Sequence, residues 1–165
     1  MLSNPAHRRA ANRWCNINMN THKSYNEILG HPHDFEVEYR ILTEKEGGRK
    51  LPPHQGIRWD FFYPNDQQDK YGVFIIWPEF IDSNGDIILT TETPIAITGK
   101  ALMWIINPER RSFHISRIKE GLIGYSMEGK RKVAECIVTK IVGLPTNPKT
   151  QEEQKKRKNI SPNSG

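Results

Sequence analysis

Several features that would assign the chain to a familiar class of protein are missing from its sequence. Only two of the 165 residues are cysteines, and Cys15 and Cys136 lie in segments of different character. A disulfide framework is therefore not indicated, and a reducing compartment is the simpler expectation. No run approaches the roughly 18 apolar residues of a membrane span, and no apolar segment typical of a secretory signal follows the N-terminal arginines. We expect a cytoplasmic protein with no membrane partner.

The motifs of common catalytic chemistry are missing as well. No G-x-x-x-x-G-K-[ST] loop occurs, because TGKAL (residues 98–102) lacks both the upstream glycine and the hydroxyl residue after its lysine. His31 and His33 lack the paired spacing of a structural zinc site. Cys136 lies in an apolar run and is typical of a buried hydrophobe, and nothing selects His114 as a catalytic base. We expect no enzyme activity, no bound nucleotide, no cofactor and no metal.

An excess of positive charge is absent from the centre of the chain, although the net charge is +5. Residues 1–34 carry a net charge of +2 and residues 145–165 carry +3. Residues 35–144 contain fifteen basic and fifteen acidic side chains and are neutral. The high isoelectric point therefore belongs to the termini and does not by itself indicate a nucleic-acid partner. It leaves open whether the central basic residues gather on one face.

Long helical periods are also absent from the centre, where a period of two dominates. FEVEYRIL, which begins at Phe35, alternates apolar and charged residues like a half-buried strand. SFHISRI (residues 112–118) alternates too, and residues 122–141 resemble a closing hairpin. Many short strands with turn residues between them favour an all-β sandwich or small barrel.

The two ends of the chain differ from this centre. We predict a flexible N-terminal arm over residues 1–34, in which SYNEILG forms a short helical turn ending at Gly30. Residues 35–144 form the β domain. Residues 145–165 are rich in Pro, Asn and Lys and have almost no apolar side chains, which predicts a disordered basic tail.

Two motifs give the central domain a resemblance to a known family. EGGR (residues 46–49) follows the first strand and precedes GIRWDF (residues 56–61), and EGKRKV (residues 128–133) leads into VTKI (residues 138–141). In this order they resemble the opening and the last hairpin of the third, C-terminal domain of translation elongation factor Tu. The chain departs from that pattern at Trp59, Ala134 and Cys136, and it is several residues longer between Gly99 and Gly121, with NPERR (residues 107–111) as the insertion.

The resemblance implies a small closed antiparallel six-stranded β-barrel over residues 35–144, without the GTPase domain of the factor. It also implies contacts with the T-stem of tRNA, partly from the Gly-Gly-Arg loop and partly from the Glu-Gly turn. The candidate RNA-binding residues are Arg49, Lys50, Glu128, Gly129, Lys130 and Arg131.

The basic triplet at Lys130, Arg131 and Lys132 has two interpretations. A charged turn keeps a sheet edge soluble without any partner. Alternatively, basic side chains and glycine-rich turns with exposed N–H groups suit phosphate contacts. The leading hypothesis is a non-catalytic binding module for tRNA or other structured RNA. The alternative is a protein-interaction domain that mimics the factor's third domain and competes for translation-machinery proteins, as an antitoxin or immunity protein would.

Overall fold

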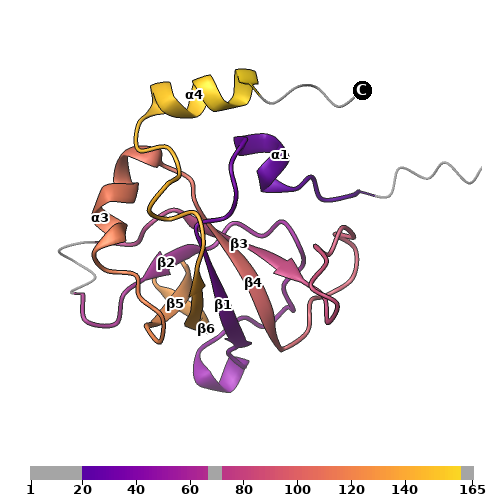
Figure 1. The fold of residues 1–165 in the computed structure, drawn as a ribbon. Coiled ribbons are helices and arrows are strands. Elements are labelled where there is room, and N and C mark those ends of the chain that lie inside the picture. Colours follow the sequence, from indigo (N-terminus) through magenta and orange to yellow (C-terminus); the bar gives the residue numbers. More distant parts are fainter. Residues whose placement is uncertain (1–19, 67–71, 161–165) are drawn as a thin grey trace, which may run out of the picture.

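Six antiparallel strands form the body of the protein in a computed structural model, which describes residues 20–66 and 72–160. The order across the sheet is β2-β5-β6-β1-β4-β3. The sheet curls into a half-barrel (Figure 1). The strands are β1 (Phe35–Ile41), β2 (Asp60–Phe62), β3 (Ile76–Ile81), β4 (Thr98–Ile105), β5 (Ile123–Glu128) and β6 (Arg131–Ile141). The prediction of a mostly β domain with six antiparallel strands is therefore confirmed.

The two edges of this sheet, β2 and β3, approach each other next to Phe61. Phe61 of β2 and Phe74, which precedes β3, exchange two backbone hydrogen bonds of 2.7 and 2.9 Å. No ladder is recorded between β2 and β3 themselves among the described residues. Closure into a complete barrel, as the sequence predicts, stays a prediction.

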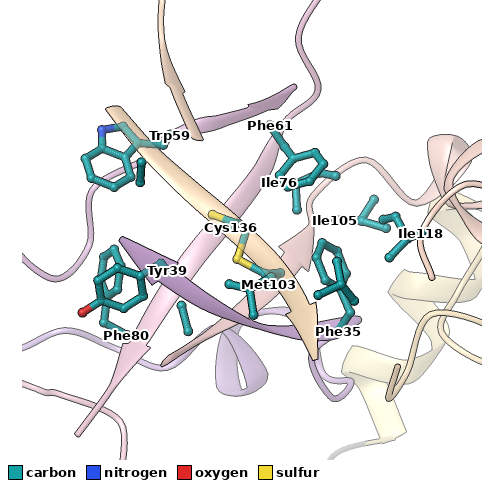
Figure 2. Packing of buried hydrophobic residues seen from close by; sticks show 14 of the residues in the cluster. Phe35, Tyr39, Trp59, Phe61, Ile76, Phe80, Met103, Ile105, Ile118 and Cys136 are labelled. Atoms are coloured by element: carbon teal, nitrogen blue, oxygen red, sulfur yellow. The ribbon is translucent and has the colours of Figure 1, made fainter. Parts of the chain in front are cut away.

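Alternation along the strands places one face of the sheet in an aromatic core. In β1, Phe35, Val37 and Tyr39 are buried, whereas Glu38 and Arg40 are exposed. Figure 2 shows aromatic side chains gathered toward both ends of this core, around Cys136 and Met103 in its centre. Truncating one such aromatic side chain to alanine typically costs about 3–5 kcal/mol.

Helices gather at one end of the sheet, where β1 begins. They are α1 (Tyr25–Leu29), the 3-10 turn η3 (Pro108–Arg110), α3 (Arg111–Ile115) and α4 (Gln151–Ile160). The loop after β1, with the 3-10 turn η2 (Glu44–Glu46), lies at the opposite end (Figure 1). The fold thus has a helical end and a loop end.

The prediction of a strand in SFHISRI is wrong, because this segment contains α3. Asn107 accepts a hydrogen bond from the Glu109 N–H and Pro108 begins η3, which together start a helical turn. The buried side chains are Arg111, His114 and Ile118, and their spacing of three and four residues is helical.

The prediction of a disordered tail is wrong for residues 145–160. Asn147 is buried, and its Nδ2 donates to the Pro32 carbonyl at 2.8 Å and to Asp34 at 3.0 Å. Arg111 donates to the Pro148 carbonyl. These polar contacts hold the segment before α4 without the apolar side chains whose scarcity suggested disorder.

The N-terminal arm is ordered where the structure describes it. The predicted turn is confirmed as α1, which ends at Gly30 in the left-handed conformation with φ of 72°. The fully buried Glu79 carboxylate accepts hydrogen bonds from the Tyr25 N–H at 2.9 Å and the Trp104 indole at 3.1 Å, and it contacts His22 Nε2 at 2.6 Å. The prediction of flexibility is thus wrong for residues 20–34, and residues 1–19 and 161–165 lie outside the described part.

Candidate nucleic-acid interface

The Gly-Gly-Arg loop at the end of β1 is held by its own hydrogen bonds. Thr43 and Glu46 form a capping box, and Arg40 binds Glu46 at 2.9 Å. The hydrogen bond from the Thr43 N–H, followed by that from Arg40, holds the pKa of Glu46 below its ordinary value. Gly48 lies so close to the chain that a Cβ there would be 2.1 Å from the Leu42 carbonyl oxygen. The loop therefore presents Arg49 from a defined backbone position.

The second predicted segment is the tight turn between β5 and β6. Glu128 pairs with Arg131, so the turn itself is Gly129-Lys130. Gly129 has φ of 59° whereas Lys130 has a negative φ, and this combination is typical of a type II′ hairpin. Lys130 and Arg131 are exposed. Both side chains are free to meet a large partner.

The structure brings these two segments together, although almost eighty residues of sequence separate them. Arg49 Nε lies 3.4 Å from Glu128 Oε2. The Trp59 indole donates to the same oxygen at 3.3 Å. Glu128 is thus an anchor that joins the loop to the turn. Its carboxylate is not a free ligand for a phosphate, which it would repel.

Lys132 differs from its two neighbours in the triplet. Like Arg131 it belongs to β6, but its ammonium lies 4.1 Å from the centre of the Tyr125 ring. A cation over an aromatic face is stabilised by the ring quadrupole. Lys132 therefore has an intramolecular contact of its own while remaining exposed.

We call the basic side chains of this end the basic rim: Lys45, Arg49, Lys50, Lys130, Arg131 and Lys132. Three acidic side chains share the end, namely Glu44, Glu46 and Glu128, and Glu46 is already paired with Arg40. The rim thus has an excess of positive charge within a domain that is neutral as a whole.

Sequence reasoning missed two residues of this end. Lys45 lies in η2 between Glu44 and Glu46. In the sequence these three residues read as a loop of mixed charge, and Lys45 did not stand out as a basic residue. Trp59 stood out only as a departure from the family pattern, yet it is buried and holds Glu128. A buried tryptophan usually donates its indole N–H to an acceptor. This requirement could have pointed to a partner such as Glu128 from the sequence.

An apolar groove lies beside the rim. It has a volume of about 260 Å³ and is lined by residues that include Arg49, Lys50, Leu51, Ile95 and Ile97. Leu51 and Ile97 are each 68% exposed, unusually high for large apolar side chains that share a groove.

Within residues 20–66 and 72–160, no group of three or more His, Cys, Asp and Glu side chains is placed to hold a metal ion. None of the helices in this part of the chain combines the length and the apolar character needed to cross a bilayer. Burial raises the pKa of the Cys136 thiol to about 11, which suits an inert core residue.

Comparison of the chain with models of protein families finds no match, and comparison with curated proteins finds none either.

Proposed function

We propose that the protein is a non-catalytic binding module that holds RNA by its phosphates through the basic rim. One observation carries this proposal: Arg49 of the loop and Glu128 of the turn are paired, so two basic segments far apart in the sequence form one surface. Phosphate contacts require basic side chains, and they position a backbone without reading its bases.

The resemblance to the third domain of elongation factor Tu supports the same surface. It assigns tRNA contacts to the Gly-Gly-Arg loop and to the Glu-Gly turn, and these two segments make up most of the rim. The backbone pair between Phe61 and Phe74 supports closure of the half-barrel into that domain's six-stranded barrel. Structured RNA, with tRNA as the first candidate, is therefore the proposed partner.

The exposure and pairing of the candidate residues support different roles for them. Lys130 and Arg131 are exposed and take part in no recorded ion pair among the described residues. Arg49 is neutralised in part by Glu128. Lys130 and Arg131 are thus the main phosphate ligands, and Arg49 contributes less in the wild-type protein.

The test is a gel-shift titration with tRNA at several salt concentrations. The double variant Lys130→Ala/Arg131→Ala should bind more weakly, and the log–log slope against salt should fall by about one unit for each lost contact. The matched control is Lys119→Ala/Lys149→Ala, which removes the same charge from exposed positions outside the rim. Equal affinities for the two double variants would refute the rim as the RNA site.

A second candidate function is a protein-interaction domain that mimics the elongation factor's third domain and competes for translation-machinery proteins. The exposure of Leu51 and Ile97 in one groove favours it, because the buried core of a protein interface is more apolar than the rest of the surface. Leu51→Ser/Ile97→Ser would abolish partner capture under this hypothesis and leave tRNA binding intact under the first. If wild-type protein fails to bind tRNA at low salt, this second candidate replaces the first.

A further inference from the structure

A separate pocket lies at the helical end of the sheet, away from the basic rim. Its volume is about 480 Å³, and residues of η3 and α3 form one side of it. Pockets of this size accommodate small organic molecules. Asn107 and Arg110 of the lining belong to NPERR, the segment by which the chain exceeds the spacing of the family it resembles.

Aromatic rings form the walls of this pocket. The centres of the Phe74 and Phe113 rings lie 5.1 Å apart at an angle of 34°. The His114 ring meets Phe74 edge to face at 4.8 Å and Phe113 at 5.3 Å. Ile105 adds an aliphatic surface. Such walls favour a flat apolar body over a purely polar ligand.

His114 is a polar side chain of this wall. Its Nδ1 lies 2.7 Å from the Tyr63 hydroxyl. Burial, helped by the charges of Arg117, Arg111 and Arg110, lowers the pKa of His114 to about 4, and burial raises the pKa of Tyr63. Both side chains are thus neutral at neutral pH, and in the tautomer whose Nδ1 accepts from the phenol the imidazole proton is on Nε2. Nε2 has no hydrogen-bond partner among the residues that the structure describes.

Two other polar side chains of the pocket, Asn107 and Arg110, are hydrogen-bond donors. Asn107 uses its Oδ1 to accept from the Glu109 N–H, which leaves its amide NH₂ group available. Arg110 supplies a guanidinium group. The neighbouring cations are neutralised, since Arg111 pairs with Asp34 and Arg117 with Asp66. Arg110 has no recorded ion pair within the described residues.

The geometry points to a binding site for a small aromatic carboxylate, whose ring lies against Phe74 and Phe113 and whose anionic head faces Arg110, Asn107 and His114. Donors without a matching acceptor favour an anion, and a guanidinium group binds a carboxylate through two parallel hydrogen bonds. Aromatic walls beside these donors favour an anion that carries an aromatic ring over a simple inorganic anion.

The test uses 2-naphthoate as the probe, with ¹H–¹⁵N NMR spectra of the full chain as the readout. We expect saturable shifts for the amides of residues 105–114 and none for residues 45–50 or 128–132. The neutral counterpart 2-naphthalenemethanol should bind at least about tenfold more weakly, and acetate should produce no saturable shift. No saturable shift with 2-naphthoate at millimolar concentration would overturn the proposal.

Variants test whether Arg110 supplies the positive charge that binds the carboxylate. Arg110→Gln should weaken 2-naphthoate binding about tenfold and leave the affinity for 2-naphthalenemethanol unchanged. Arg110 is exposed, so the fold should tolerate this change. The matched control Lys100→Gln removes one positive charge at an exposed position that does not line this pocket, and it should leave binding of both probes unchanged. Equal loss in the two variants, or equal affinity of the wild-type protein for the two probes, would refute the anion site.

Discussion

Replacing Glu128 with glutamine tests the proposed RNA surface by a gain of affinity. Glu128 neutralises Arg49 across a distance of 3.4 Å and accepts a hydrogen bond from Trp59. Glutamine keeps an oxygen for the Trp59 indole and removes the negative charge. Arg49 is then free to bind a phosphate, and the basic rim gains one unit of positive charge.

The size of the gain follows from electrostatics. A carboxylate about 7 Å from a phosphate in water repels it by about 0.6 kcal/mol, so its removal should strengthen binding about threefold at low salt. If Arg49 adds one phosphate contact, the log–log salt slope should steepen by about one unit. The Arg49 side chain is 21% exposed and that of Glu128 is 44% exposed, so losing this screened ion pair should cost only about 0–1 kcal/mol of folding stability.

The measurement is the same tRNA titration at several salt concentrations, with thermal unfolding to confirm the fold. Glu120→Gln serves as the control, because it makes the same change in net charge at an exposed position outside the rim. A gain in Glu128→Gln that the control lacks would support the surface. Unchanged or weaker tRNA binding by Glu128→Gln, with the fold intact, would refute the reasoning.

Three further predictions concern the fold. Arg111→Met should lower the free energy of unfolding by about 3–5 kcal/mol in urea titrations, because it leaves the fully buried Asp34 without its 2.7 Å partner; a loss under about 1 kcal/mol would contradict this. Gly48→Ala should destabilise the loop by about 1–3 kcal/mol and weaken tRNA binding, since its Cβ would lie 2.1 Å from the Leu42 carbonyl oxygen; wild-type melting temperature and affinity would count against it. The pKa of His114 is about 4 in the fold and about 6.5 in the unfolded chain, so its contribution is present at neutral pH and is lost as pH falls from about 6.5 to about 4. The wild-type protein should lose about 3 kcal/mol more stability over that window than His114→Gln, and parallel pH profiles of the two would disprove this.

Local patterns predicted the elements whose structure depends on neighbours in the sequence. Alternation identified β1 and its buried Phe35, and the glycine that ends SYNEILG marked the end of α1. The turn at Gly129 was also readable, because a tight hairpin needs a residue with positive φ. In each case the physical cause lies within a few residues of its effect.

Elements held by distant polar contacts were not readable in this way. The segment before α4 is ordered because Asn147 and the Pro148 carbonyl meet Pro32, Asp34 and Arg111. Composition alone reports few apolar residues there and cannot report those partners. The segment of α3 was taken for a strand for a related reason. Phe113 and Ile115 alternate with polar residues, which is typical of a strand. The side chains of this helix that are fully buried are those of Arg111 and His114, a charged and a polar residue.

The charge of the central domain shows why the candidate site could be predicted only in part from the sequence. Counting residues gives a neutral domain, because a count weighs every side chain equally. In the fold, Asp66 and Glu79 of this domain are engaged by Arg117 and His22 away from the rim, so these two carboxylates do not offset the positive charge of the loop end. A binding surface depends on which charges remain unmatched at one place, and that quantity exists only after folding. The decisive contact at the rim therefore involves a negatively charged side chain. Glu128 joins the two basic segments, and by pairing with Arg49 it also neutralises part of the charge that Arg49 would offer to a phosphate.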